Sequence, residues 1–385
     1  MGMAGLYIHI PFCKQLCHYC DFFSCISLAK TGPVLEALLR EMELRRRFLP
    51  GDSLSTFYVG GGTPSVYAPQ ELGRLTARAR ELWDCTGLEE STVEVNPDDL
   101  SPACLDGLLR AGFDRLSIGI QSFVDRDLRL MNRRHTAEGA EKAVREAQRA
   151  GFGNISIDLI YGIPGMSDRE WRDNLERALS LEVQHISAYH LTVEPRTVFG
   201  RRAAQGKFTP VDEETSQRQY LTLHRTLTAA GYEHYEISNF ARPGRRSRHN
   251  SAYWTGEPYL GIGPSAHSYD GRRRSWSPPS LARYLGELEE GTLYEEETLT
   301  EEERYDELVM VSLRRAEGVD TAELERRFGA RKLRYFEESA RRFVEAGILE
   351  HTGGRYRLRP EEYLVSDGVI CELFWPGDGE THTYK

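Results

Sequence analysis

The stretch Ile10-Pro11-Phe12-Cys13-Lys14-Gln15-Leu16-Cys17-His18-Tyr19-Cys20-Asp21-Phe22 carries three closely spaced cysteines. Three thiolates at this spacing can hold three irons of a cubane 4Fe-4S cluster, and the fourth iron is then left open for a ligand. Inside cells, closely spaced cysteines bind metal or do redox work more often than they form disulfides. The alternative is a structural zinc site with His9 or His18 as fourth ligand, but zinc sites usually show paired C-x2-C or H-x3-H spacing. The spacing therefore favours a cluster with one open iron.

Six short apolar runs, rich in β-branched residues, alternate with amphipathic helical patterns along the first half of the chain. The predicted strands span 6–10, 56–60, 92–95, 115–120, 155–160 and 185–191. The predicted helices span 33–48, 69–83, 102–110, 136–150 and 168–181. This alternation is typical of parallel strands joined by crossover helices. We therefore predict an α/β fold, a partial (β/α)6 barrel that is open on one side.

Polar and glycine residues lie at the carboxyl ends of these predicted strands. Along the chain they are the cysteine loop, Gly60-Gly61-Gly62-Thr63-Pro64, Glu94 before Asn96-Pro97, Gln121, Asp158, and the segment from His190 to Thr192. In parallel sheets and β/α barrels the ligand lies at this edge. We therefore expect six separate segments to converge on one binding site.

The glycines, Glu94 and the nearby Arg133 each have a chemistry suited to contact with a ligand. Glycines let the backbone approach a ligand closely. Glu94 lies in an apolar strand, where a carboxylate is costly to bury without a cationic partner. Arg133, beside Arg134, can bind a carboxylate through two parallel hydrogen bonds. A tight turn at 60–64, and polar groups satisfied at strand ends, are the plain structural alternatives.

The cysteine spacing, with aromatic Tyr19 before the last cysteine, resembles the signature of the radical S-adenosylmethionine superfamily. The resemblance implies that Cys13, Cys17 and Cys20 ligate a 4Fe-4S cluster and that S-adenosylmethionine occupies the open iron. In that superfamily, reduction of the cluster cleaves the sulfonium to a 5'-deoxyadenosyl radical. The resemblance further implies these S-adenosylmethionine contacts: Gly61, Gly62, Thr63 and Glu94 towards the methionyl amine, Arg133 towards the carboxylate, Gln121 and Asp158 towards the ribose, and Tyr7 and Thr192 near the cluster and adenine.

Three longer runs narrow this resemblance. Arg115–Phe123, Ile157–Gly165 and Tyr235–Ala241 are similar to the coproporphyrinogen III oxidase-like branch, and the similarity covers nearly the whole chain. That branch includes oxygen-independent oxidases and haem chaperones of the HemW family. The chaperones are favoured because the cluster loop begins at residue 13, without the oxidase's N-terminal extension, and because Phe22 replaces a cysteine of the oxidase. The run His249-Asn250-Ser251-Ala252-Tyr253-Trp254 also matches the HNxxYW motif that is associated with haem binding in that family.

His249 is accordingly the candidate haem ligand. A neutral imidazole can ligate iron, and Tyr253 and Trp254 offer aromatic faces to a porphyrin. Arginines that could meet the propionates stand at 242, 245, 246, 248 and 272–274. A solvated basic loop or a capping histidine is the alternative. His267, in the glycine-rich stretch Pro258–Ser268 that we predict as a loop, is a second candidate.

The composition changes from about residue 290, where acidic helical patterns begin and are followed by a hairpin over 348–358. This pattern predicts a smaller α+β, winged-helix-like C-terminal domain. The predicted domains are 1–205 for the partial barrel, 206–288 for a barrel extension with the haem motif, and 289–385 for a HemN-type C-terminal domain. The net charge of -10 argues against a nucleic-acid partner.

The sequence therefore favours a cytoplasmic haem chaperone that binds a 4Fe-4S cluster, S-adenosylmethionine and haem and passes haem to acceptors such as respiratory enzymes. Two enzymatic alternatives are oxidative decarboxylation of coproporphyrinogen III and radical methyl transfer in haem breakdown. A structural iron-sulfur or zinc protein is the non-enzymatic alternative. No catalytic residue is assigned. No segment approaches 18 consecutive apolar residues, so we predict no membrane span, only transient contact with membrane-bound acceptors, and we allow for a homodimer.

Overall fold

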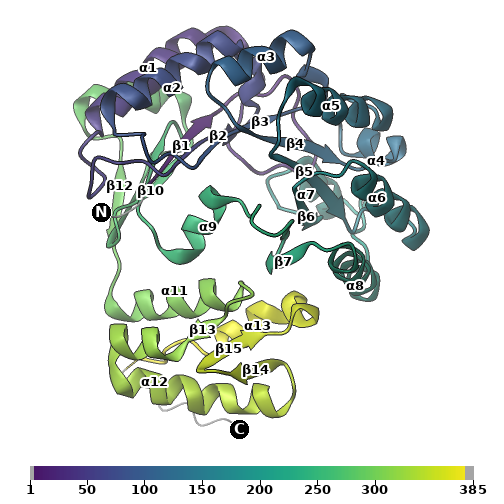
Figure 1. Cartoon of the computed structure of the whole chain (residues 1–385), viewed down its shortest axis with the longest axis vertical. Coiled ribbons are helices and arrows are strands. Elements are labelled where there is room, and N and C mark those ends of the chain that lie inside the picture. The colour runs from purple at the N-terminus through teal and green to yellow at the C-terminus, as the bar shows by residue number, and fades with distance from the viewer. Residues whose placement is uncertain (1–3, 378–385) are drawn as a thin grey trace.

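Six parallel strands form the centre of the molecule in a computed structural model that describes residues 4–377 (Figure 1). They are β1 (Gly5–Ile10), β2 (Thr56–Gly61), β3 (Glu90–Val95), β4 (Arg115–Gln121), β5 (Ile155–Tyr161) and β6 (His185–His190). Each strand pairs in parallel with the next along the chain. The main crossover helices are α1 (Thr31–Leu44), α2 (Pro69–Leu82), α3 (Pro102–Arg110), α5 (Ala137–Ala150) and α6 (Asp168–Ser180). The predicted partial (β/α)6 barrel is confirmed.

Local sequence signals set the ends of the crossover helices. The Thr136 hydroxyl accepts a hydrogen bond from the backbone of Gly139 and so begins α5. Gly151, with a φ of 107°, ends the same helix in the left-handed conformation that glycine tolerates. Ser167 and Glu170 cap the start of α6 reciprocally. These caps lie within one or two residues of the predicted helix boundaries.

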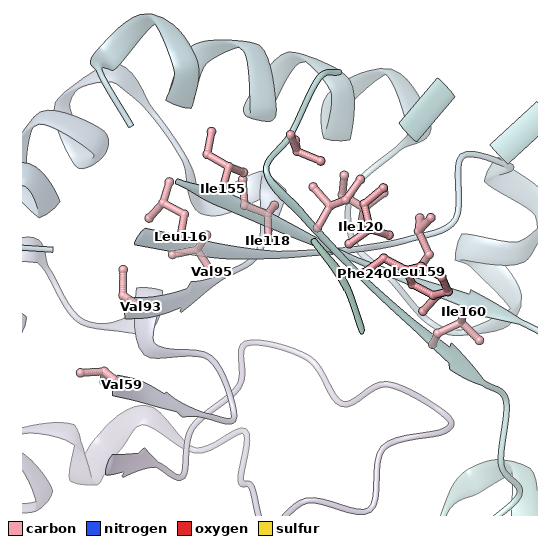
Figure 2. Packing of buried hydrophobic residues seen from close by; sticks show 14 of the residues in the cluster. Val59, Val93, Val95, Leu116, Ile118, Ile120, Ile155, Leu159, Ile160 and Phe240 are labelled. Carbon is pink, nitrogen blue, oxygen red and sulfur yellow. The ribbon is translucent and has the colours of Figure 1, made fainter. Parts of the chain in front are cut away.

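The two faces of the strands differ in chemistry. The outward row of each strand is apolar and buried under the helices, and Figure 2 shows several of these side chains along β2 to β5. They include Val59, Val93, Leu116, Ile118, Ile155 and Leu159. The inward row alternates with it and is largely polar, for example Thr56 and Tyr58 on β2 and Thr92 and Glu94 on β3. The hydrophobic core therefore lies between the sheet and the helices, whereas the barrel interior is lined largely by polar side chains.

Further strands extend this sheet on both sides, and the sequence patterns did not predict them. Beside β6 lie β8 (Asn239–Ala241) and β7 (Glu233–Glu236). Beside β1 lie β9 (Tyr259–Ile262), β10 (His267–Tyr269), β11 (Arg273–Trp276) and β12 (Glu295–Thr298). The prediction of a loop over 258–268 was therefore wrong, because β9 pairs in parallel with β1. The short helix α9 (Arg248–Thr255) precedes β9 and lies below the barrel (Figure 1).

The C-terminal part has the predicted order of helices followed by a hairpin. It contains α11 (Glu301–Leu313), β13 (Val319–Asp320), α12 (Thr321–Glu345), β14 (Leu349–Thr352), β15 (Arg355–Leu358) and α13 (Ser366–Cys371). Helix α12 is kinked at Gly329, and Gly353 and Gly354 form the hairpin turn with positive φ angles. The smaller α+β domain is thereby confirmed. The domain boundaries after 205 and 288 stay predictions, and β12, which follows the second boundary, pairs with β11 of the large sheet.

Within residues 4–377, none of the helices has the length and apolar character needed to cross a membrane.

Candidate cofactor site

A cavity of about 580 Å³ opens at the carboxyl ends of the six parallel strands. It brings together most of the residues that the sequence predicted for the cluster and for S-adenosylmethionine. Its lining includes Cys13, Cys17, Cys20, Gly61, Gly62, Thr63, Glu94, Gln121, Arg133, Asp158 and Thr192. Two predicted residues, Tyr7 and His249, are not among those that line it.

The three cysteines lie in the loop that follows β1, at one wall of the cavity. The Thr63 hydroxyl donates to Cys13 Sγ at 3.5 Å, and Arg133 Nη1 donates to Cys17 Sγ at 3.2 Å. Burial raises the pKa of the Cys20 thiol to about 11, and the pKa of Cys13 is raised as well. Binding of a metal or cluster would release these protons. In the described part of the chain, no three His, Cys, Asp or Glu side chains are arranged to hold a metal ion.

The two histidines of the zinc alternative have hydrogen-bond partners other than the thiols. His9 Nε2 lies 3.0 Å from the carbonyl oxygen of Phe23, and its Nδ1 lies 3.1 Å from the hydroxyl of Tyr7. His18 Nδ1 lies 2.9 Å from the carbonyl oxygen of Leu130. These contacts disfavour a zinc site with His9 as ligand, because both of its ring nitrogens have protein partners, whereas His18 keeps Nε2 without a hydrogen bond among the described residues.

Glu94 forms an acidic wall of the cavity. Its carboxylate accepts hydrogen bonds from the Tyr58 hydroxyl at 2.7 Å and from the backbone of Gly61 at 3.1 Å. Burial raises the pKa of Glu94 to about 7, and the nearby Asp158 charge acts in the same direction. A Cβ at Gly60 would lie 2.8 Å from Glu94 Cδ, so the glycine run makes room for this carboxylate. A cationic ligand would stabilise the ionised form.

Arg133 supplies the positive charge on another side of the cavity. Its Nη2 donates to Asn96 Oδ1 at 2.6 Å and to the carbonyl oxygen of Gly119 at 2.7 Å. Its Nε is buried without a hydrogen-bond partner among the described residues. Arg134 instead pairs with Asp98 at 2.7 Å outside the cavity. The geometry thus separates two neighbouring arginines that the sequence alone does not.

Hydrogen-bond acceptors line the remaining side of the cavity. Gln121 ends β4 with a φ of 69°, next to an irregularity in the β4–β5 pairing. Asp158 lies 3.4 Å from the hydroxyl of Ser117, and burial raises its pKa to about 6. Thr192 is exposed at the end of the segment that follows β6. These groups can accept hydrogen bonds from a polyhydroxylated ligand.

Sequence reasoning assigned no role to three further residues of the lining, Asn96, Ser117 and Tyr189. Ser117 and Tyr189 lie on the inward rows of β4 and β6, so the alternation within each strand was the signal that could have found them. Asn96 was noted as the end of β3, and the structure shows it bridging Arg133 and Thr63.

The two predicted residues outside the lining are buried below the cavity, inside the barrel. Tyr7 lies next to His249, with ring centroids 6.2 Å apart. His249 is only 1% exposed, with Nδ1 2.8 Å from the Thr56 hydroxyl and Nε2 2.9 Å from the Tyr253 hydroxyl. Both ring nitrogens therefore have protein partners in this conformation.

Several arginines that were considered for haem propionates are paired with acidic side chains. Arg246 pairs with Glu233 and Glu317, and Arg248 pairs with Glu89. Arg273 and Arg274 form ion pairs as well, with Asp270, Glu296, Glu297 and Glu307. His267 lies on β10 and stacks on Trp276 at 5.8 Å. A propionate would have to compete with these carboxylates for the same guanidinium groups.

Comparison with known proteins yields two family matches. The model of the radical SAM superfamily matches residues 7–178, and the model of the HemN C-terminal domain matches residues 299–365. The chain is 32% identical over 364 residues to the "Heme chaperone HemW" of Lactococcus lactis subsp. lactis, covering 94% of this chain and 95% of that one. It is 34% identical over 372 residues to that of Bacillus subtilis, covering 96% and 98%.

A solved structure has the same overall architecture. It is described as the coproporphyrinogen III oxidase HemN from Escherichia coli, a radical SAM enzyme. The TM-score is 0.83 at 25% sequence identity, and the match covers 97% of this chain and 90% of that chain.

Proposed function

The chain belongs to the HemW family within the radical S-adenosylmethionine superfamily, and from this premise we propose that it is a haem chaperone. It binds a 4Fe-4S cluster, S-adenosylmethionine and haem, and it transfers haem to acceptor proteins such as respiratory enzymes. We further propose that the protein is cytoplasmic, that it contacts membrane-bound acceptors transiently, and that it can form a homodimer.

One observation carries the cofactor part of this proposal. A single cavity combines three thiols, the buried carboxylate of Glu94 and the guanidinium of Arg133. The thiols suit three irons of a cluster, whereas the carboxylate and the guanidinium suit the amine and carboxylate of an amino acid. When bound together, a reduced cluster and S-adenosylmethionine supply a 5'-deoxyadenosyl radical.

The protein's own residues bind and orient these groups. Cys13, Cys17 and Cys20 hold the cluster as thiolates. Glu94 and the backbone around Gly61 to Thr63 receive the methionyl amine, and Arg133 receives the carboxylate. Gln121 and Asp158 accept hydrogen bonds from the ribose, Thr192 lies beside the adenine, and Tyr7 supports the site from below.

Haem contact is proposed at the HNxxYW segment, with His249 as candidate axial ligand. Because His249 is buried and Thr56 and Tyr253 occupy both of its ring nitrogens, ligation of iron requires a rearrangement at α9, of its side chains or of the whole helix. The bound form would therefore differ from this structure at α9.

The oxidase alternative is kept because the match to HemN spans the whole fold. Both functions are tested by anaerobic reconstitution of the cluster, followed by parallel assays of haem binding and of coproporphyrinogen III decarboxylation with S-adenosylmethionine and reductant. Stoichiometric haem binding without protoporphyrinogen supports the chaperone. Decarboxylated product that is absent with Cys17→Ala would instead make the protein an oxidase.

A further inference from the structure

A column of aromatic rings fills the barrel directly below the cofactor cavity. The ring of His249 stacks on Tyr58 with centroids 4.9 Å apart and an interplanar angle of 24°. Tyr7 packs against the same imidazole, and Tyr253 meets it edge-on at 5.1 Å. The hydrogen bonds to Thr56 and Tyr253 fix the imidazole in its own plane. His249 of α9 is thus held rigidly between Tyr253 of the same helix and Thr56 and Tyr58 of β2.

The upper end of this column touches the acidic wall of the cavity. The Tyr58 hydroxyl donates to Glu94 at 2.7 Å, and its ring rests on His249. A Cβ at Gly60 would lie 2.8 Å from both Glu94 Cδ and Tyr58 Cε1, so the carboxylate and the phenol are packed closely around this glycine. Any shift of the phenol would therefore move or release the carboxylate.

We infer that Tyr58 and His249 are positioning residues for Glu94, and that the histidine of the HNxxYW motif supports the S-adenosylmethionine site from below. This inference rests on the proposed function, in which Glu94 receives the methionyl amine. His249 supports the flat face of Tyr58, and Tyr58 directs the carboxylate into the cavity. Neither residue touches the ligand itself.

The pH dependence of S-adenosylmethionine affinity reports the protonation of Glu94. It would not change if Tyr58 and His249 only stabilised the fold. The methionyl amine group donates to the carboxylate form, so below about pH 7.7, where the free ligand's own ammonium group begins to titrate, affinity rises as the pH rises through the pKa of Glu94. Burial raises that pKa to about 7, and the hydrogen bond from Tyr58 lowers it. The titratable or charged groups around Glu94 are Tyr58, Asp158, Arg115, Tyr7, Tyr253 and Tyr189. All but Tyr58 stay in place in a Tyr58→Phe variant, so loss of the phenol should move the midpoint to higher pH.

The test measures S-adenosylmethionine affinity by equilibrium dialysis across neutral pH, with the cluster reconstituted in every variant. Tyr58→Phe should weaken binding about tenfold at neutral pH, the usual effect of losing a hydrogen bond to a charged group, and should raise the pH midpoint. His249→Ala removes the ring under Tyr58 and should weaken binding severalfold. His249→Phe keeps a ring there and should bind nearly as tightly as the wild type, although it cannot ligate iron.

Two further variants separate this inference from the proposed function. Tyr259→Phe removes a hydroxyl from the ring that packs on Tyr253, farther from Glu94, and should leave affinity and midpoint unchanged. Glu94→Gln should weaken binding and remove the transition near pH 7, while the titration of Asp158 near pH 6 remains. If Glu94→Gln acts as expected while Tyr58→Phe and His249→Ala bind like the wild type, the positioning role is wrong and the proposed site stands. If the wild type does not bind, or Glu94→Gln changes nothing, the proposed site itself is wrong, and the inference falls with it.

Discussion

At the scale of single residues, the ionised carboxylate of Glu94 serves ligand binding but lowers the stability of the ligand-free fold. Both of its hydrogen-bond donors, Tyr58 and the backbone of Gly61, are neutral, and burial raises its pKa to about 7. A carboxyl group whose pKa is raised in the folded state stabilises the fold while it is protonated. That stability is lost as the pH rises through the folded pKa, so the ligand-free protein is destabilised above about pH 7.

We therefore expect the free energy of unfolding of Glu94→Gln to exceed that of the wild type by on the order of 2 kcal/mol at about pH 8. At about pH 4 we expect no difference between the two proteins. The measurement is thermal unfolding of the ligand-free proteins at both pH values. Asp158, whose pKa is also raised, titrates in both proteins and does not create the difference. Glu89→Gln, at a solvent-exposed carboxylate, is the control. Equal melting differences at the two pH values would contradict the prediction.

Gly60 shows why this site needs a residue without a side chain. A methyl group there would lie 2.8 Å from Glu94 Cδ, which is closer than non-bonded carbons pack. We expect Gly60→Ala to fold but to displace the carboxylate and to weaken S-adenosylmethionine binding about tenfold. Dialysis against the labelled ligand measures this. Gly153→Ala adds the same methyl where no heavy atom lies within 4 Å, and should bind normally. A Gly60→Ala protein with wild-type affinity would show that the carboxylate is not so confined.

At the scale of elements, α9 is anchored by a buried carboxylate at its start. Glu90 of β3 accepts from the backbone nitrogens of Arg248 at 2.9 Å and His249 at 3.2 Å, and it is 2% exposed. The first amides of a helix need such acceptors, and a carboxylate also meets the positive end of the helix dipole. Glu90 therefore holds the helix that carries the HNxxYW motif inside the barrel.

Replacement of Glu90 by Gln should loosen α9 without unfolding the barrel. The amide keeps one acceptor but loses the charge, which also faces the buried Arg115 at 3.8 Å, so the cost is about 3–5 kcal/mol. Hydrogen exchange of the α9 amides should then become faster, whereas exchange in α5 should not change. Glu89→Gln is the matched control, because Glu89 pairs with Arg248 only on the surface, where such pairs contribute little. Unchanged α9 exchange in Glu90→Gln would mean that another contact anchors the helix.

The elements that the sequence predicted are those with strong local patterns. The six parallel strands are short runs rich in β-branched and other apolar residues, and the polar residues at their ends, such as Glu94 and Gln121, follow from the rule that ligands lie at the carboxyl edge. Strands β7 to β12 are short, and β9 pairs with β1 from the far end of the chain, so no local pattern predicts them. The burial of His249 was equally hidden, because a histidine among arginines suggests a surface, whereas its partners Thr56 and Glu90 lie far away in the sequence.

At the scale of the whole molecule, α9 lies between two regions. Its histidine contacts Tyr58, which lies below the cofactor cavity, and in Figure 1 the helix stands above α11 of the C-terminal part. The hairpin of β7 and β8 joins that part to the barrel, because Ile237 N donates to Arg314 O and Ala316 N donates to Tyr235 O, both at 3.0 Å. A shift of α9 could therefore transmit a change at the cofactor cavity to the C-terminal part of the molecule.

This arrangement makes the two proposed ligands of the protein compete for one side chain. His249 cannot support Tyr58 and ligate haem iron at the same time, because its ring nitrogens and its stacking face are already engaged inside the barrel. S-adenosylmethionine, which favours the ordered Glu94, should therefore weaken haem binding, and by linkage haem should weaken S-adenosylmethionine binding by the same factor. We expect a factor of about ten, within the usual range of coupling between sites.

Haem titrations followed by absorbance, with and without saturating S-adenosylmethionine, measure the effect of S-adenosylmethionine on haem affinity. Dialysis of S-adenosylmethionine with and without haem measures the reverse effect. Equal factors in both measurements establish the linkage. His249→Phe keeps the support under Tyr58 but cannot ligate iron, so in this variant S-adenosylmethionine should no longer affect whatever haem affinity remains. Coupling of wild-type size in His249→Phe would mean that the two ligands communicate through another part of the barrel, and no coupling in the wild type would mean that haem is bound without moving α9.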